Sequence, residues 1–344
     1  MTKPGNDILE VTDLRTHFFT ETGGALPAVD GVSFRIPRGK TLAIVGESGC
    51  GKSVTSYSLL RLVQPPGRII GGRIVLRSSR LGEVDIAALR EDDDRLYQVR
   101  GGAVSMIFQE PMTALSPVHT VGAQIMKAIH LHQDVSREQA RATTIDMLRR
   151  VGVSAPERRV DQYPHELSGG MRQRAVIAMA LVCRPELLIA DEPTTALDVT
   201  IQAQILGLIR TMQAQIGCSV LLITHDLGVV AQMADEVAVM YLGRIVEHGP
   251  VRQVVKDPRH PYTQGLLRSL PGANRGASRL PSIPGVVPSL HAIPPGCPFH
   301  PRCAQAIAGR CDVGPAPSAA TLADGRRISC VRAAELPPLA PGQP

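Results

Sequence analysis

Short runs of apolar residues alternate along the chain with longer stretches in which apolar residues recur at helical spacing. The runs have the length and the β-branched content of strands and lie at 8–14, 32–36, 41–45, 186–190 and 219–224. The helical spacing is found from about residue 53, over 120–150 and from 169 to 182. Strands that alternate with helices predict an α/β fold, with a mostly parallel sheet covered on both faces.

The same pattern changes along the chain and indicates its organisation. Residues 8–45 are rich in strand-like runs, and we expect a loop over 20–31. Helical spacing dominates residues 109–174, where we expect a compact inserted helical subdomain. Towards the C-terminus the sequence becomes rich in Pro, Gly and Ala. We therefore predict one domain over 1–255 and an irregular C-terminal extension over 256–344.

Composition excludes several classes of protein. The 344 residues correspond to about two domains, and 44% hydrophobic with 20% charged residues excludes a disordered chain or a disulfide-dense mini-protein. We find neither a run of 18 apolar residues nor the apolar segment of a signal peptide, and we expect a cytoplasmic protein. The net charge of +6 fits nucleic acid, an anionic membrane surface or a nucleotide and selects none of them.

A phosphate-binding loop is predicted directly after the strand at 41–45. The sequence GESGCGKS matches G-x-x-x-x-G-K-[ST] between a strand and a helix, and a glycine-rich turn without a ligand is the less favoured alternative. Its residues are Gly46, Glu47, Ser48, Gly49, Cys50, Gly51, Lys52 and Ser53. Glycines let backbone N–H groups curl around a phosphate, at the positive end of a helix. We expect Lys52 on the β- and γ-phosphates and Ser53 on Mg²⁺.

Two acidic residues at the end of another strand predict the catalytic part of the site. Residues 187–190 are apolar, and Asp191 and Glu192 follow them. Asp191 can hold Mg²⁺, directly or through water. Glu192 can polarise the water that attacks the γ-phosphate. A plain acidic turn is the alternative, and the phosphate loop upstream disfavours it.

A third motif, LSGGMRQ at 167–173, lies 18 residues before the two acids. Ser168 can cap the following helix, and Gly169 and Gly170 leave backbone N–H groups bare, which makes a second anion site; a capped helix start alone is the competing interpretation. At this point the chain resembles the ATP-binding subunits of ABC (ATP-binding cassette) transporters, whose signature is LSGGQ. Met171 stands where the family most often has Gln.

This resemblance implies an ABC-type P-loop ATPase with a RecA-like core, and it assigns further residues. It places Gln109 on Mg²⁺ and at the membrane subunits, His225 on the γ-phosphate and Asp198 in a loop that crosses the dimer interface. It places Phe18 on adenine, with Phe19 a close rival. In the family two ATPase domains dimerise head to tail, so that each ATP lies between one phosphate loop and the partner's signature. Both catalytic acid–base residues are present, and we expect an active ATPase.

The C-terminal extension narrows the resemblance. The sequences HPYTQGLL (260–267) and GCPFHPRC (296–303) are similar to the extension of oligopeptide, dipeptide and nickel importer ATPases. This implies a peripheral protein on the cytoplasmic face of the inner membrane, with two transmembrane permease subunits, a second ATPase subunit of the same or a related chain, and an external solute-binding protein. It favours peptides as cargo, with nickel or another small solute as the alternative.

A soluble ABC ATPase that acts on nucleic acid is the alternative from another class. The net charge of +6 and the cysteine content favour it. Such proteins usually carry two cassettes or a long coiled-coil insertion, whereas this chain has one phosphate loop and a compact insertion. Aromatic residues are only 3% of the chain, which disfavours stacking on single-stranded bases. We expect no nucleic-acid partner.

Four of the seven cysteines gather within 34 residues of the extension: Cys297, Cys303, Cys311 and Cys330. The cytoplasmic location disfavours disulfides, and the C-x₂₋₄-C pairs of most zinc sites are missing. Iron–sulfur clusters also take four thiolates, and the resembled importer subunits can carry a [4Fe-4S] cluster here. The resemblance therefore favours this cluster in a structural role, while zinc and four unrelated thiols stay open. We interpret the remaining Cys50, Cys183 and Cys218 as small buried thiols.

Overall fold

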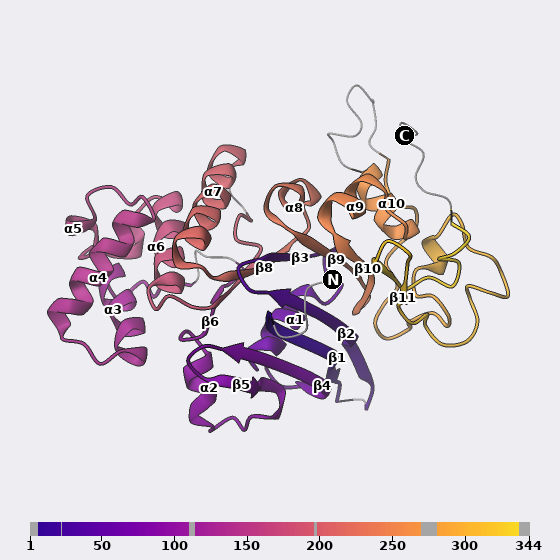
Figure 1. Ribbon diagram of the computed structural model, residues 1–344, viewed down its shortest axis with the longest axis horizontal. Coiled ribbons are helices and arrows are strands. Elements are labelled where there is room, and N and C mark those ends of the chain that lie inside the picture. Colours follow the sequence, from indigo (N-terminus) through magenta and orange to yellow (C-terminus); the bar gives the residue numbers. More distant parts are fainter. Residues whose placement is uncertain (1–5, 22, 110–113, 196–197, 270–280, 337–344) are drawn as a thin grey trace.

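The computed structural model describes residues 6–21, 23–109, 114–195, 198–269 and 281–336, which form two packed sheets with helices around them (Figure 1). The smaller sheet has the strand order β2-β1-β4-β5, and the larger has the order β11-β12-β10-β9-β3-β8-β7-β6. No helix in these ranges is long and apolar enough to span a membrane.

The smaller sheet is antiparallel and comes from the N-terminal quarter of the chain. Its strands are β1 (Asp7–Phe19), β2 (Ala25–Pro37), β4 (Gly67–Ser78) and β5 (Gly82–Asp85). The loop expected over 20–31 is shorter than predicted, because β2 already begins at Ala25. Phe19 of β1 pairs with Ala25 of β2. Pro27 and Gly31, which predicted a loop, lie within β2, where the pairing with β1 has irregularities in its register.

The larger sheet has the parallel core that the pattern predicts. Its strands are β3 (Thr41–Val45), β6 (Val104–Ile107), β7 (Leu187–Asp191), β8 (Ser219–Thr224), β9 (Glu236–Tyr241), β10 (Arg244–Pro250), β11 (Ala320–Thr321) and β12 (Arg327–Ile328). The strands β9, β3, β8, β7 and β6 are parallel neighbours. Every residue of β3, β7 and β8 is buried, which explains the apolar runs that make up most of each strand.

Helices lie around the sheets and form a separate group at one end (Figure 1). They are α1 (Lys52–Leu59), α2 (Asp94–Val99), α3 (Val121–His132), α4 (Arg137–Arg150), α5 (Pro156–Arg159), α6 (Gly169–Leu181), α7 (Val199–Ile216), α8 (Leu227–Met233), α9 (Val251–Lys256) and α10 (Pro261–Arg268). Short 3₁₀ helices span Ile86–Ala88, Pro164–Glu166 and His300–Arg302. The group at the end consists of α3 to α6.

The helical spacing over 120–150 belongs to two helices rather than one. Thr120 caps α3, since its side chain accepts a hydrogen bond from the backbone of Ala123. Ser136 and Gln139 form a capping box that starts α4 anew after a short break. The two helices pack against α6, which begins at the predicted residue.

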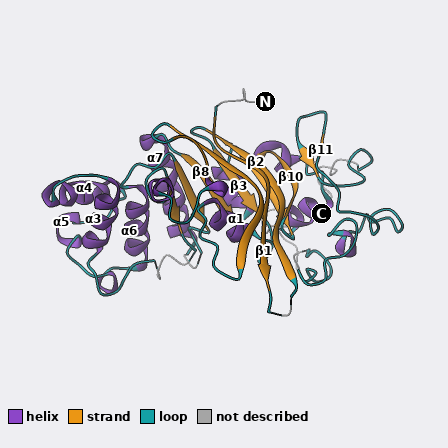
Figure 2. Cartoon of the chain, turned by 90° about the horizontal axis from the view of Figure 1, so that it is seen from below, coloured by secondary structure: helices purple, strands orange, loops and turns teal. Residues whose placement is uncertain are grey.

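The C-terminal extension consists mostly of loops, at the opposite end of the molecule from the helical group (Figure 2). Two short strands nevertheless join it to the large sheet, because Ile328 of β12 pairs with Glu247 of β10. Strands of two residues have no periodicity in the sequence, which is why they escaped prediction.

A buried ion network anchors the extension beside this strand pair. The guanidinium of Arg326, which is 1% exposed, lies 2.7 Å from Asp324, 2.9 Å from Asp257 and 3.6 Å from Glu247. Burial raises the pKa of Glu247, whose carboxylate also accepts hydrogen bonds of 2.9 Å from the backbone N–H groups of Arg259 and His260. The cation therefore balances a carboxylate that has no access to water.

Replacing Arg326→Gln should lower the free energy of unfolding by about 3–5 kcal/mol, because it leaves buried carboxylate charge without its cation. Urea denaturation of the purified chain measures this loss. The matched control is Arg141→Gln, which breaks an exposed pair with Asp161 and should cost about 1 kcal/mol or less. Equal, small losses in both variants would contradict the anchoring role of Arg326.

Candidate nucleotide-binding site

The predicted phosphate loop leaves the sheet at the end of β3 and leads into α1. Its glycines are required where the loop passes other backbone: a Cβ at Gly46 would lie 2.2 Å from the Met240 carbonyl oxygen, and one at Gly51 2.2 Å from that of Ala28. Lys52 Nζ donates hydrogen bonds to the carbonyl oxygens of Gly46 (2.9 Å) and Glu47 (3.1 Å). The ammonium group is thus held over the loop, where it can meet phosphate oxygens.

Asp191 lies fully buried beside the start of α1. Its two carboxylate oxygens accept hydrogen bonds from Ser53 Oγ (3.2 Å) and Ser56 Oγ (3.1 Å). Burial raises the pKa of Asp191, and the two hydrogen bonds act in the opposite direction. A hydroxyl and a carboxylate are hard oxygen ligands that suit Mg²⁺, so the pair Ser53 and Asp191 fits the predicted metal role. Sequence reasoning missed Ser56, although it follows Ser53 by one helical turn.

Glu192 is held at the centre of a polar group above the loop. Its backbone has a φ of 46°, a strained conformation for a residue with a side chain. Thr195 Oγ1 donates to Glu192 Oε2 over 2.8 Å, and Gln109 Nε2 lies 3.5 Å from the same oxygen. His225 Nδ1 lies 3.3 Å from the other oxygen, Oε1. The structure therefore brings three predicted residues together and adds Thr195, which no sequence motif indicates.

The signature motif lies elsewhere on the chain. Ser168 caps α6, with its Oγ 3.4 Å from the backbone N of Met171. A Cβ at Gly169 would meet no atom within 4 Å, so the start of the helix is uncovered. No hydrogen bond of the described residues links Ser168, Gly169 or Gly170 to the phosphate loop. The two predicted anion sites are separate within one chain.

Asp198, which the resemblance places in the dimer-interface loop, lies at the start of α7. Asp198 caps α7 and accepts a hydrogen bond of 3.0 Å from the backbone N of Ile201. Ala196 and Leu197, in the same predicted interface loop, lie outside the described residues.

Two aromatic rings near the start of the chain, Phe18 and Phe19, lie in different surroundings. A Cβ at Gly67 would lie 2.6 Å from the ring of Phe18, which therefore covers the start of β4. The guanidinium of Arg68 lies 4.1 Å from the centre of the Phe19 ring. Both rings are half-buried, and the adenine role of Phe18 stays a prediction.

The four cysteines of the extension gather around one small cavity, as Cys297, Cys303, Cys311 and Cys330 all line it. All four are free thiols. Burial raises the pKa of Cys297 to about 11. Within the described residues, no three His, Cys, Asp or Glu side chains are arranged to hold a metal ion. The four cysteines that are close in the sequence are thus also close in space, and the metal that they would hold stays a prediction.

The other three cysteines are buried thiols, as interpreted from the sequence. Cys50 and Cys218 are 1% exposed and Cys183 is 4% exposed. Burial raises the pKa values of Cys183 and Cys218 to about 11, so both stay protonated at neutral pH.

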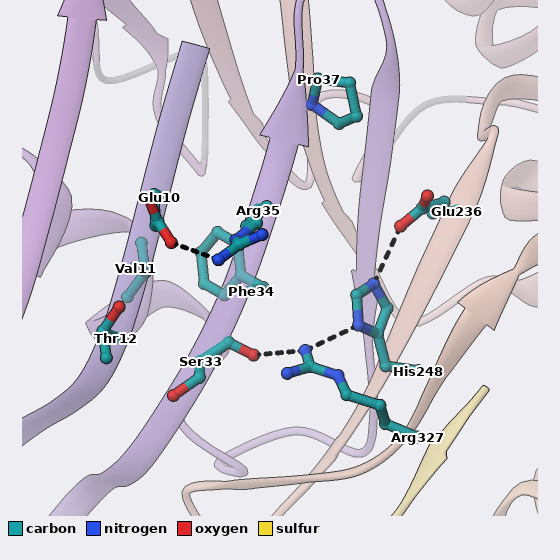
Figure 3. Close-up of a pocket in the computed structure, with 10 residues that line it drawn as sticks. All are labelled: Glu10, Val11, Thr12, Ser33, Phe34, Arg35, Pro37, Glu236, His248 and Arg327. Atoms are coloured by element: carbon teal, nitrogen blue, oxygen red, sulfur yellow. Dashed lines mark hydrogen bonds and ion pairs between the residues drawn. The ribbon is translucent and has the colours of Figure 1, made fainter. Parts of the chain in front are cut away.

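A separate cavity of about 440 Å³ lies between the two sheets (Figure 3). Its charged side chains largely bind one another: Arg35 pairs with Glu10 over 2.6 Å, and His248 Nε2 lies 3.1 Å from Glu236. Arg327 bonds the Ser33 carbonyl oxygen at 2.8 Å and lies 2.9 Å from His248 Nδ1. None of the residues that line this cavity belongs to the predicted nucleotide site.

Comparison with known proteins decides the family. Residues 29–195 match the ABC transporter family, and residues 246–311 match the C-terminal region of oligopeptide/dipeptide transporters. The chain is 54% identical over 302 residues to the probable peptide ABC transporter ATP-binding protein y4tR of Sinorhizobium fredii, covering 87% of this chain and 88% of the relative. The chain belongs to the ABC transporter ATPases. This ABC ATPase is also 48% identical over 323 residues to the oligopeptide transport ATP-binding protein AppD of Bacillus subtilis, covering 94% and 96% of the two chains.

Solved structures confirm the fold of this ABC ATPase. The dimeric ATP-binding cassette MJ0796, bound to ADP and phosphate, matches 71% of this chain and 99% of its own with a TM-score of 0.61 at 24% identity. CbiO1 from Clostridium perfringens, part of the transporter complex cbiONQ, matches 72% and 90% with a TM-score of 0.59 at 27% identity. The α/β fold and the ATPase family expected from the motifs are therefore confirmed.

The geometry explains how this ABC ATPase can hydrolyse ATP. Lys52 and the N–H groups of the loop are placed to stabilise negative charge on phosphates, and Mg²⁺ held by Ser53 and Asp191 would neutralise more of it. One oxygen of Glu192 is occupied by Thr195, which orients the carboxylate. The other can take the proton of the attacking water, with His225 beside it.

Replacing Glu192→Gln should reduce kcat by about 10²- to 10⁴-fold, because the amide cannot accept the water proton. ATP binding should persist, because the amide has nearly the same shape and Lys52 is untouched. Steady-state phosphate release and nucleotide titration measure the two properties. Lys52→Ala is the matched contrast and should lose binding itself. Near-normal turnover of Glu192→Gln would show that another group is the base.

Proposed function

We propose that this ABC ATPase is the energy-coupling subunit of a membrane importer for oligopeptides or dipeptides. The observation that carries the proposal is its match over 246–311 to the C-terminal region of oligopeptide/dipeptide transporters, together with the phosphate loop and catalytic group. Relatives named as peptide transport ATP-binding proteins, such as AppD, support the same cargo. Nickel or another small solute is the alternative cargo for the same ATPase role.

The proposal includes a head-to-tail dimer of ATPase domains, from this chain or with a related one. The uncovered helix start at Ser168 and Gly169 supports it, because this anion site does not meet the phosphate loop of its own chain. Val199, next to Asp198 in the expected interface, is 83% exposed although it is apolar. A second copy that brings its signature to the γ-phosphate would use both features. ATP then closes the dimer, and hydrolysis reopens it.

A cavity between the sheet core and the helical group supports a permease contact. It has a volume of about 640 Å³ and is lined by Tyr57, Phe108 and Leu131, with Gln109 at its side. Leu131 is 69% and Phe108 39% exposed, so the lining offers apolar surface. We infer that each of the two ATPase subunits receives a cytoplasmic segment of one permease subunit in this cavity, next to Gln109. This docking would place the chain on the cytoplasmic face of the membrane, below an external solute-binding protein.

The deciding experiment is ATP hydrolysis by the chain assembled in membranes with the permease and ATPase subunits encoded beside it. Solute-binding protein loaded with a peptide mixture should stimulate turnover, whereas the empty binding protein should not. Stimulation by a nickel-loaded binding protein instead would keep the ATPase role and overturn the cargo. A failure to form any membrane complex, with tight and salt-dependent binding of DNA or RNA, would favour the soluble alternative.

We infer that the four gathered cysteines hold a [4Fe-4S] cluster, with Zn²⁺ as the alternative. Four thiolates on one zinc ion each lie about 2.3 Å from the same atom, whereas those of a cluster bind different irons and stand further apart. The four cysteines line one shared cavity, as either group would need, and the resemblance of the extension to importer ATPases favours the cluster. The cluster would pin a loop-rich segment that has little core of its own.

Protein purified without oxygen should contain about four iron and four sulfide per chain, with the visible absorption of a cluster. Iron and sulfide analysis beside metal analysis for zinc measures this. Cys183→Ser is the matched control. The Cys183 thiol bonds the Ala128 carbonyl oxygen and does not line the cavity, so this variant should leave the iron content unchanged. Stoichiometric zinc, or neither metal, would overturn the cluster.

A further inference from the structure

An arginine of the C-terminal extension forms a salt bridge with a residue of the phosphate loop. Arg302 Nη1 and Nη2 donate to the two carboxylate oxygens of Glu47 over 2.6 Å and 3.0 Å. This forked geometry is the strongest form of a charge-assisted pair. Glu47 lies inside the phosphate loop, 255 residues earlier in the chain. The extension therefore reaches the residues that surround the phosphates.

The arginine itself is fixed before it meets the loop. Its side chain is 4% exposed, and its Nε donates to the carbonyl oxygen of Pro284 over 3.1 Å. The guanidinium also lies 5.9 Å from the centre of the Tyr241 ring. The hydrogen bonds from Arg302 to Glu47 raise the pKa of the guanidinium above its ordinary value. Because the guanidinium is buried and held on a third side, this pair is more rigid than an exposed pair on the surface.

The same loop residue is held at its backbone by a second residue from outside the core motif. The Glu47 N–H donates to Tyr262 Oη over 2.9 Å. Tyr262 is fully buried in α10, and burial raises the pKa of its hydroxyl, which stays protonated. Its ring centre lies 4.7 Å from that of Tyr241 and 5.3 Å from that of Phe299. Three buried rings thus join β9, α10 and the cysteine segment beneath the loop.

These contacts engage all the polar groups of Glu47, and its carbonyl oxygen meets Lys52 of the nucleotide site. Its side chain binds Arg302, its N–H binds Tyr262, and its carbonyl oxygen accepts from Lys52 Nζ over 3.1 Å. The carbonyl orientation therefore depends on anchors that the extension supplies. A loop that is ordered in advance binds phosphate better, because the entropy of ordering it has already been lost.

We propose that Arg302 and Tyr262 are positioning residues for nucleotide binding, and that through Glu47 they hold the phosphate loop in its binding shape. The proposal rests on the ATPase activity and not on the identity of the cargo. The extension is then part of the nucleotide site in structure, although neither residue lies within the matched ABC region at 29–195. Because Arg302 directly precedes Cys303, a cysteine segment with a fixed structure also fixes Arg302, and through Arg302 it restrains the phosphate loop.

The test is nucleotide affinity of the purified full-length chain, titrated with a fluorescent ATP analogue and Mg²⁺. Arg302→Gln should raise Kd about tenfold or more, because the loop must then be ordered by the ligand. Arg302→Lys keeps the charge without the fork and should recover part of the affinity. Tyr262→Phe removes only the hydroxyl and should weaken binding less. Arg310→Gln is the control, since it breaks an exposed pair with Glu335 in the same extension and should leave Kd unchanged.

A second variant shows whether Arg302 acts through Glu47. Glu47→Gln should raise Kd as much as Arg302→Gln, and the double variant should be no worse than either, because all three lack the same link. In the membrane assembly, Arg302→Gln should raise KM for ATP and leave kcat at saturating ATP within about twofold.

Several outcomes would overturn the proposal. One is a lower thermal midpoint of Arg302→Gln with Kd and KM unchanged, which would make the residue merely structural. Another is a loss of kcat with an unchanged KM, and a third is additive effects in the double variant. Because Kd is measured on the chain alone, the outcomes in Kd are independent of whether peptides stimulate the assembled transporter.

Discussion

Three buried strands end level with one another at one edge of the large sheet, and the groups of the site take their positions from this alignment. Ile44 of β3 and Asp191 of β7 both pair with Ile223 of β8. The phosphate loop therefore begins two residues beyond this level on β3, and Glu192 lies one residue beyond the same level on β7. His225 lies two residues beyond Ile223, just after β8, which is the strand between β3 and β7. Apolar packing of the strands thus sets the distances between charged groups that carry no packing energy of their own.

Sequence reasoning found the groups that such strands carry, because each motif is local. The glycines of the phosphate loop, the acids at the end of β7 and the histidine after β8 all lie within two residues of a buried apolar run. The fold class followed from the same runs. The helical spacing over 120–150 was also read correctly, although the break before Ser136 needed its capping box to be recognised.

The groups that sequence reasoning missed depend on contacts between distant parts of the chain. The pair of Arg302 and Glu47 spans 255 residues, and nothing near either residue marks the other. Thr195 meets Glu192 only because the backbone turns through a φ of 46°. The strand β12 forms on the edge that β10 offers, and β11 pairs in turn with β12, so neither depends on a pattern in its own sequence.

The polar group around Glu192 is half open to water in a single chain. Glu192 is 13% exposed, but the His225 side chain is 64% exposed and Gln109 is exposed beside it. Charge stabilisation in catalysis is strongest where water is excluded, because the effective dielectric constant falls there. The face that carries these residues therefore needs a cover for full activity. The uncovered helix start at Ser168, which has backbone N–H groups but no phosphate of its own chain, is the surface of complementary charge that a second ATPase domain would bring to it.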